Sequence, residues 1–201
     1  MSIDPNTAVI VGVGQVSHKA TGLDDALTPA ELMAEAIRRA ATDAGLASVP
    51  DVDSLRVVST LSWRASDPAR ELAAALGISV RHTGLSTPGG NSPQSLVNAT
   101  ALEIQDGTLD LVILTGGEAW RTLQRYRKSG DKPAWAVKQP GPAPDRIHGE
   151  DLEMSHPGEQ AHGIIMPVQI YPMFETAIRH ANGRSVEEQM KVCLLYTSPS
   201  P

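Results

Sequence analysis

The stretch GGNSPQSLVNATALEIQDGTLDLVILTGGEA, which runs from Gly89 to Ala119, decides the fold. Its middle part, Leu96–Ile104, is rich in Ala, Leu and Val and carries little charge, which predicts a helix that is apolar on most faces and therefore buried. Asp106-Gly107 predicts the end of this helix, and LDLVILT at Leu109–Thr115 predicts a strand that ends at Gly116-Gly117-Glu118. A buried helix followed at once by an apolar strand is typical of an α/β protein.

The sequence before this stretch repeats the alternation of strands and helices. TAVIVGV at Thr7–Val13 is a β-branched run that predicts a strand buried on both faces. A helix is predicted from Thr28, because Thr28 and Glu31 form a capping box and Pro29 suits the first helical position. Further strands are predicted at residues 54–60 and 80–85, with a helix between them that starts at Asp67-Pro68. This order predicts an α/β fold with a parallel-rich sheet and helices on both faces.

The alternation breaks after the Gly-Gly turn. Residues 120–172 hold many prolines and scattered glycines, which predicts a long loop excursion packed over one end of the sheet. Helices are predicted again near Met173–Ala181 and from Ser185, where Ser185 and Glu188 form a second capping box. We therefore predict a core at residues 1–119, a loop domain at 120–172 and returning helices at 173–192.

The last nine residues, CLLYTSPSP at 193–201, do not continue the preceding helical pattern. They resemble the translation of a sequencing-library adapter joined to an interrupted reading frame. The alternative is a natural disordered tail. We predict a non-native tail, in which case Cys193 is foreign to the natural protein and the natural chain continues after about Val192.

Composition excludes several classes of function. The net charge is -6 and aromatic residues make up 3% of the chain, which disfavours binding to nucleic acid or to an anionic membrane. The apolar run Ala8–Val13 is too short for a membrane span, and no basic residue precedes it. We expect a cytoplasmic protein. A single cysteine allows no intrachain disulfide and no cysteine-based zinc site.

The glycine-rich turn TPGGNSPQS, Thr87–Ser95, is the strongest candidate for chemistry. Asn91 or Ser92 can cap the helix that follows, and Pro93 suits its first turn. The free N–H groups of such a helix end stabilise a developing anion, and Ser92 is a candidate nucleophile without an identifiable base. The alternative is a well-capped core helix without a functional role.

Three other features carry weaker signals. The sequence GVGQVS at Gly12–Ser17 is similar to a dinucleotide-binding turn, but it lacks the third glycine and is not followed at once by a helix. The alternative is the end of a strand followed by a loop. Gly116-Gly117-Glu118 allows close approach of a ligand or a neighbouring chain, or is a plain tight turn. Histidines and carboxylates between His148 and His162 match no zinc-binding spacing, so we expect a solvated loop and no metal.

The whole pattern resembles the first half of a thiolase. The stretches that carry the resemblance are AVIVGVGQ (8–15), TPAELMAEAIRRAATDAGL (28–46), the Gly89–Ala119 stretch and YPMFETAIRHANGRSVEEQ (171–189). Within the superfamily, GGNSPQSLVN and PVQIYPMFETAIR are most similar to type 1 thiolase-like proteins, which are often labelled acetyl-CoA acetyltransferases. The resemblance implies the N-terminal part of one half of a five-layer αβαβα fold.

Family chemistry is the condensation or cleavage of acyl-coenzyme A, with a cysteine at the start of the buried helix as the nucleophile. Here that position falls within Gly89, Gly90 and Asn91, none of which is cysteine. The resemblance therefore implies no catalytic residue in this chain. It implies substrate-binding roles for five residues: Gly90, Asn91, Ser92, Ile170 and Tyr171. A coenzyme A thioester is the expected ligand, with no covalently bound cofactor.

The leading functional hypothesis is a thiolase-like acyl-CoA C-acyltransferase that lacks the nucleophilic cysteine in the residues given. The alternative is a non-catalytic protein that binds coenzyme A or acyl-coenzyme A. A nucleotide-dependent oxidoreductase rests on Gly12 and Gly14 alone. The expected partners are acyl-CoA and a second thiolase half, with homo-oligomers as a further expectation. Without the second half, an apolar face is expected to be exposed, and the chain is expected to associate with itself.

Overall fold

The computed structural model describes residues 6–138, 140–153 and 155–197, and the side chains among them up to Val192. The chain forms two compact units, the first ending at Asp151 and the second beginning at Leu152. Each unit is described separately below.

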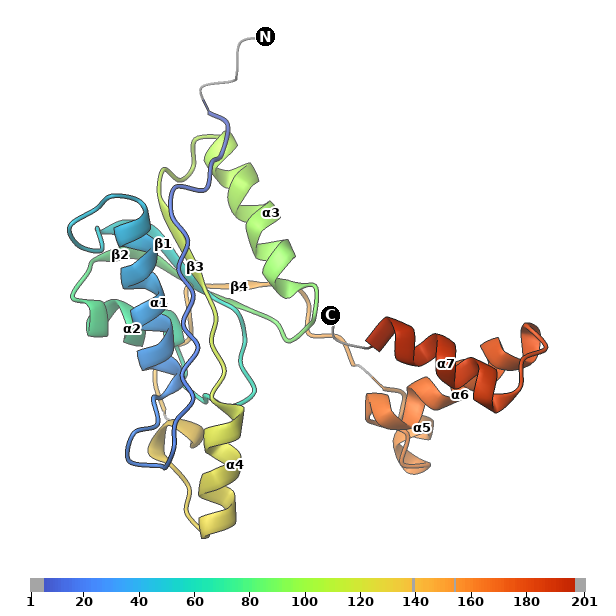
Figure 1. The fold of residues 1–201 in the computed structure, drawn as a ribbon. Helices are drawn as coiled ribbons and strands as arrows, with labels where there is room; N and C mark the ends of the chain where they lie inside the picture. The colour runs from blue at the N-terminus through green and yellow to red at the C-terminus, as the bar shows by residue number, and fades with distance from the viewer. Residues whose placement is uncertain (1–5, 139, 154, 198–201) are drawn as a thin grey trace. The chain divides into compact units, whose positions relative to one another are not determined.

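The first unit is built on a four-stranded sheet. Its strands are β1 (Val52–Val57), β2 (Val80–Ser86), β3 (Val112–Thr115) and β4 (Arg146–His148), in the order β3-β1-β2-β4 (Figure 1). All three pairings are parallel. The predicted parallel sheet is thus confirmed, although β4 lies in a stretch that was predicted to be loop.

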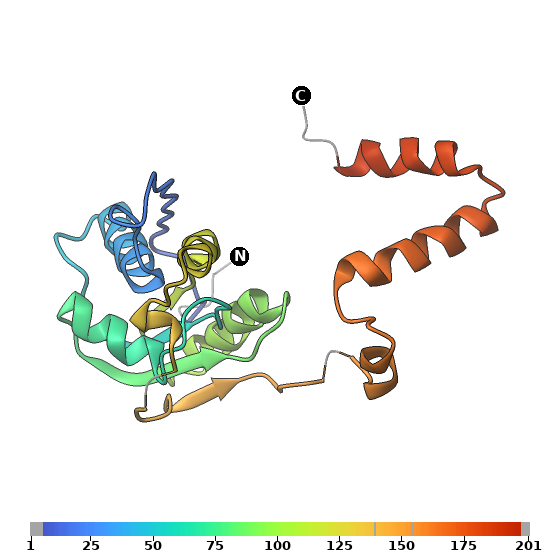
Figure 2. The ribbon, with the colours of Figure 1, turned by 90° about the horizontal axis from the view of Figure 1, so that it is seen from below.

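Helices cover both faces of the sheet, as predicted. Helices α1 (Pro29–Asp43) and α2 (Pro68–Leu76) lie on one face, and α3 (Ser92–Gln105) lies on the other (Figures 1 and 2). The capping box that starts α1 is present, since Glu31 N donates to Thr28 Oγ1 over 3.2 Å and Thr28 N donates to Glu31 Oε2 over 2.8 Å. Asp67 caps α2 by accepting a hydrogen bond from Arg70 N over 3.0 Å, and Gly77 ends that helix with φ 71°.

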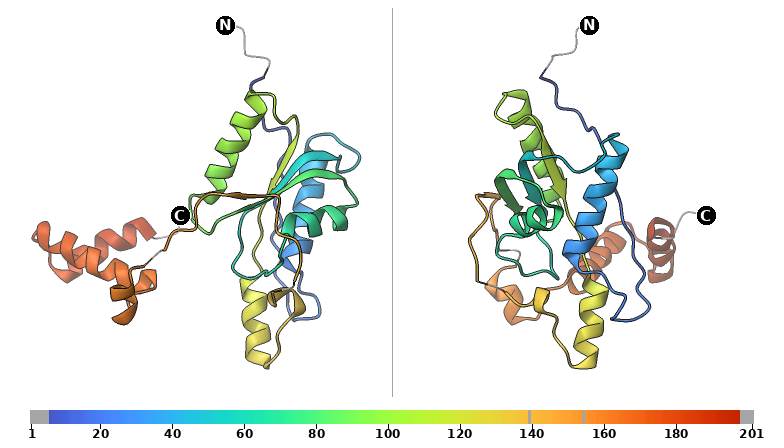
Figure 3. Two further views of the ribbon diagram at one scale, coloured as in Figure 1. Left: turned by 180° about the vertical axis from the view of Figure 1, so that it is seen from behind. Right: turned by 90° about the vertical axis from the view of Figure 1, so that its left-hand side faces the viewer.

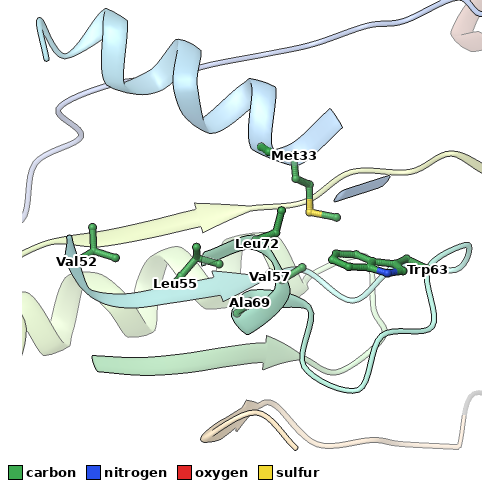
Figure 4. Packing of buried hydrophobic residues seen from close by; sticks show 8 residues of the cluster. Met33, Val52, Leu55, Val57, Trp63, Ala69 and Leu72 are labelled. Atoms are coloured by element: carbon green, nitrogen blue, oxygen red, sulfur yellow. The ribbon is translucent and has the colours of Figure 1, made fainter. Parts of the chain in front are cut away.

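The hydrophobic core lies between the sheet and the α1–α2 layer. Met33 extends from α1 toward the ring of Trp63, and Leu55 and Leu72 fill the space beneath them (Figure 4). Met33, Leu55, Val57 and Leu72 are all fully buried. Complete burial of such side chains stabilises the fold by about 1.5–3 kcal/mol each.

The prediction that α3 is apolar and buried on most faces is wrong. Only Ser92, Leu96 and Thr100 are buried, while Val97 and Leu102 expose 40% and 64% of their surface. The buried residues recur every fourth position, so α3 contacts the sheet along one narrow stripe. The apolar composition of the remaining faces is therefore left at the surface of this unit.

The predicted strand at Thr7–Val13 is also absent. This segment is extended but forms no strand, and Ile10 is 80% exposed. It runs along α1 (Figure 3), where a Cβ on Gly12 or Gly14 would lie about 2 Å from the carbonyl oxygen of Ala40 or Ala36. The two glycines thus allow the segment to pack on the helix backbone. The β-branched composition of the segment does not indicate this packing.

Residues 120–172 are more regular than predicted. In the first unit they contain α4 (Trp120–Ser129), a 3-10 turn η1 (Ala134–Ala136) and strand β4, and α5 (Pro157–Ala161) follows in the second unit. Strand β4 was missed because three residues carry too little periodicity to predict a strand.

The second unit consists of α5, α6 (Pro167–Ala181) and α7 (Val186–Thr197). Helix α6 starts earlier than predicted, and the Ser185–Glu188 capping box of α7 is present. Helix α7 continues through Thr197, into the predicted tail, and residues 198–201 lie outside the described residues. Among all described helices, none has the length and apolar character needed to cross a membrane.

Candidate functional site

The glycine-rich turn between β2 and α3 is held by hydrogen bonds from three sides. The hydroxyls of Ser86 and Ser92 both donate to the carbonyl oxygen of Thr87, over 3.0 and 2.7 Å. Thr87 N donates to the carbonyl oxygen of His148 on β4, over 2.9 Å. The turn is therefore fixed at its start, at the carboxyl end of a parallel strand, where ligands bind in open α/β sheets.

The first turn of α3 has no side-chain cap. Asn91 occupies the N-cap position, but its side chain forms no capping hydrogen bond, and the Ser92 hydroxyl donates to Thr87, which corrects the prediction that Asn91 or Ser92 caps this helix. The Ser92 side chain is buried and its hydroxyl proton is directed to Thr87, so Ser92 stabilises the turn instead of presenting a free hydroxyl. Ser92 N donates to the carbonyl oxygen of Gly89 over 3.1 Å and Pro93 has no N–H, so among the described groups of this first turn Gln94 N is the one positioned to stabilise negative charge.

The two glycines of the turn differ in the space around them. A Cβ on Gly89 would lie 2.8 Å from Asn91 Oδ1 and 3.1 Å from Ser92 Oγ, whereas a Cβ on Gly90 would meet nothing within 4 Å. Gly90 thus faces open space at the end of the helix. A ligand atom can approach the backbone there without displacing any side chain.

A hollow of about 210 Å³ lies at the carboxyl ends of β1 and β2. Its lining combines apolar groups, among them Trp63 and Leu85, with the cations Arg64 and Lys138. Ser86 connects the hollow to the turn, because its hydroxyl accepts from Ser59 N, over 2.9 Å, and donates to Thr87. A hollow with apolar and cationic walls and an uncapped helix end therefore share one edge of the sheet.

A buried polar network supports the α3 side of the site, and sequence analysis missed it. Arg56 on β1 is 2% exposed and donates to Thr100 Oγ1 over 2.8 Å and to the Glu103 carboxylate, both on α3. Arg146 on β4 donates to the other oxygen of Glu103 over 2.8 Å. One carboxylate thus holds three elements together. In the sequence, this network is indicated only by the charged residues Arg56, within a strand, and Glu103, within a largely uncharged helix.

His148 borders this network at the edge of the sheet. Its Nε2 is buried without a hydrogen-bond partner among the described residues, and it lies 3.0 Å from the Cβ position of Gly84. Burial, followed by the nearby Arg56 and Arg146 guanidinium groups, lowers the pKa of His148 below its usual value. Protonation of His148 is therefore disfavoured in the folded chain.

The Gly116-Gly117-Glu118 sequence joins two loops. The Glu118 carboxylate accepts hydrogen bonds from Leu61 N, over 2.8 Å, and from both N and Oγ of Ser62, over 3.1 Å. A Cβ on Gly117 would lie 3.0 Å from Met33 Cγ. The close approach predicted for this turn is therefore an approach to α1, and Glu118 fixes the loop that follows β1.

The remaining predicted site residues lie elsewhere in the chain. Ile170 and Tyr171 belong to α6 in the second unit, where the Tyr171 and Phe174 ring centroids are 6.5 Å apart. Gly12 and Gly14 pack on α1 and open no helix, which removes the basis of the dinucleotide-binding hypothesis. Within the described residues, no group of three or more His, Cys, Asp or Glu side chains is placed to hold a metal ion.

Comparisons with known proteins support a single family. No protein-family model matches the chain, and no curated protein sequence does. Among solved structures, the chain is similar to a monomeric SCP2-thiolase like protein type 1 from Mycobacterium smegmatis, with 26% sequence identity and a TM-score of 0.66. The match covers 94% of this chain and 33% of that protein, so the chain spans about a third of its length. The strand and helix order, the parallel sheet and this similarity together place the chain in the thiolase-like superfamily.

Proposed function

We propose that the chain provides the acyl-thioester-binding turn of a thiolase-class acyl-CoA C-acyltransferase. The observation that carries the proposal is the uncapped start of α3, at a turn whose Gly90 faces open space. The similarity to an SCP2-thiolase like protein supports the choice of ligand class. The ligand in this proposal is a coenzyme A thioester, and no covalently bound cofactor takes part.

The physical basis is electrostatic. A thioester carbonyl oxygen gains negative charge during acyl transfer, and N–H groups at a helix N-terminus stabilise that charge. The Ser86, Ser92 and His148 contacts hold the Thr87 end of the turn before any ligand arrives. Preorganisation of this kind lowers the cost of binding. The apolar part of the neighbouring hollow offers room for a short acyl group.

A second candidate is binding of the acyl-thioester without turnover. It is favoured by the absence of cysteine from residues 89–92 and by the Ser92 hydroxyl, whose proton is directed to Thr87. Incubation of the chain with acyl-CoA, followed by intact-mass measurement, separates the two candidates. A covalent acyl adduct on the chain supports the transferase, and bound ligand without an adduct supports the binding protein.

Binding at the turn is tested by calorimetric titration with S-acetyl-N-acetylcysteamine, a thioester without phosphate groups. We expect Gly90→Asp to weaken binding by about tenfold or more, because a carboxylate at the helix end repels the polarised carbonyl oxygen. The open space at Gly90 means that the variant should fold normally.

The matched control is Asn98→Asp, which adds the same charge to an exposed position of the same helix. We expect that variant to bind as the unaltered chain does. Equal binding by the Gly90→Asp variant and the unaltered chain would remove the turn from the proposal.

A further inference from the structure

We infer that the first unit contains a second site, separate from the acyl-thioester turn, that binds a phosphate group. The site is a hollow of about 80 Å³ between residues 18–20 and the start of α4. This is several times the room that one water molecule needs, which suits one small tetrahedral anion. A nucleic acid strand does not fit into a hollow of this size.

The hollow is lined by three cationic side chains, Lys19, Arg121 and Arg125. Among the described residues, none of the three forms an ion pair with a carboxylate. No direct ion pair among the described residues therefore offsets their mutual repulsion. An anion in the hollow would relieve it, and Arg groups bind phosphate oxygens through paired N–H donors.

Arg125 is held in place without being neutralised. Its Nη1 donates to the carbonyl oxygens of Ala20, over 2.8 Å, and Gly22, over 3.2 Å. These partners carry no net charge, so the guanidinium keeps its full positive charge at a fixed position. The hydrogen bonds also hold the loop that carries Lys19 beside α4.

The one carboxylate that lines the hollow is already engaged. Glu118 accepts three hydrogen bonds from Leu61 and Ser62, which lie in the loop after β1. These donors are neutral, so Glu118 keeps its negative charge, and the lining still holds three cationic side chains against one carboxylate. It does not complete an ion pair with Arg121 or Arg125.

The charge around the hollow is opposite to that of the whole chain. The chain carries a net charge of -6, yet residues 118–138 contain six cationic side chains and two acidic side chains, Glu118 and Asp131. The cationic side chains are Arg121, Arg125, Arg127, Lys128, Lys132 and Lys138. A local positive surface on an acidic protein concentrates small anions at that surface.

Calorimetric titration with inorganic phosphate tests the site directly. We expect the chain to bind phosphate and Arg121→Gln to weaken this binding by about tenfold or more, because charged hydrogen bonds to the anion are lost. Lys128→Gln is the matched control, since it removes one positive charge from the same helix outside the hollow. We expect less than about a twofold change there. Lys19→Gln probes the opposite wall and replaces Arg121→Gln if that variant does not fold.

Two results would overturn the inference: no phosphate binding by the unaltered chain, or equal losses in the Arg121→Gln and Lys128→Gln variants. The test is independent of the acyl-thioester proposal, because S-acetyl-N-acetylcysteamine carries no phosphate. A parallel titration with coenzyme A identifies the source of the phosphate. If the Arg121→Gln variant binds coenzyme A more weakly than the unaltered chain, the site binds a phosphate group of coenzyme A. If coenzyme A binding is unchanged, the site binds the phosphate group of another ligand.

Discussion

The two faces of the sheet are stabilised by different chemistry, although the same strands form both. Along β1, Leu55 and Val57 pack into the apolar core under α1 and α2. Ser54 and Arg56 alternate with them and join the polar network under α3. The apolar face provides stability through burial, and the polar face positions α3, and with it the uncapped helix end, through directed bonds. We therefore expect substitutions on the two faces to destabilise the fold for different physical reasons.

The largest effect is expected from Arg56→Met. Removing Arg56 leaves the Glu103 carboxylate with the largely exposed Arg146 as its remaining ion-pair partner and costs up to about 3–5 kcal/mol of unfolding free energy. Denaturant titration measures this loss. The double variant Arg56→Met, Glu103→Leu should regain most of it, because no buried charge is left unpaired. A double variant as unstable as the single one would show that shape, not charge, dominates this face.

On the apolar face, Leu55→Ala should cost about 2–5 kcal/mol through lost burial and a residual cavity. The control is Leu102→Ala on the exposed side of α3, which should change stability by less than about 0.5 kcal/mol. Comparable losses in the two variants would mean that the outer side of α3 is buried in solution, as self-association of the chain would cause.

The smallest effect concerns pH and tests His148. Its pKa is lowered in the folded state, chiefly by burial and then by Arg56 and Arg146. Well above pH 6.5 this residue is neutral in both the folded and the unfolded state, so stability does not depend on its titration there. As the pH falls below 6.5, His148 is protonated in the unfolded chain but not in the folded chain. The free energy of unfolding therefore decreases by at most about 1.4 kcal/mol per pH unit.

Unfolding measurements between about pH 8 and about pH 5 detect this dependence, and His148→Gln should flatten it. If the free energy of unfolding depends on pH equally in the variant and the unaltered chain, other titratable groups cause the dependence.

The comparison of the two faces also explains what the sequence could predict. The capping boxes at Thr28 and Ser185, and the caps of α2, depend on neighbouring residues, and all of them are present. The Arg56–Glu103 contact joins residues 47 positions apart, so no local pattern indicates it. The turn at Gly89–Ser92 was located correctly, but its hydrogen bonds depend on β4, which was not predicted.

Burial was predicted least well, because composition does not specify the partner. The run at Thr7–Val13 and the strand β3 are both β-branched and apolar, yet the first lies along a helix and the second lies in the sheet. Helix α3 has the composition of a buried helix and contacts the sheet along a single stripe. Whether each segment is buried is decided by the contacts that it makes in the folded chain.

The most direct test of the central claim is an amide chemical-shift map of the ¹⁵N-labelled chain, recorded during titration with S-acetyl-N-acetylcysteamine. We expect the largest shifts at Gly89, Gly90, Asn91 and Gln94, at the uncapped start of α3. Shifts confined to other parts of the chain, or no saturable shifts at all, would contradict the claim that this turn binds the acyl-thioester.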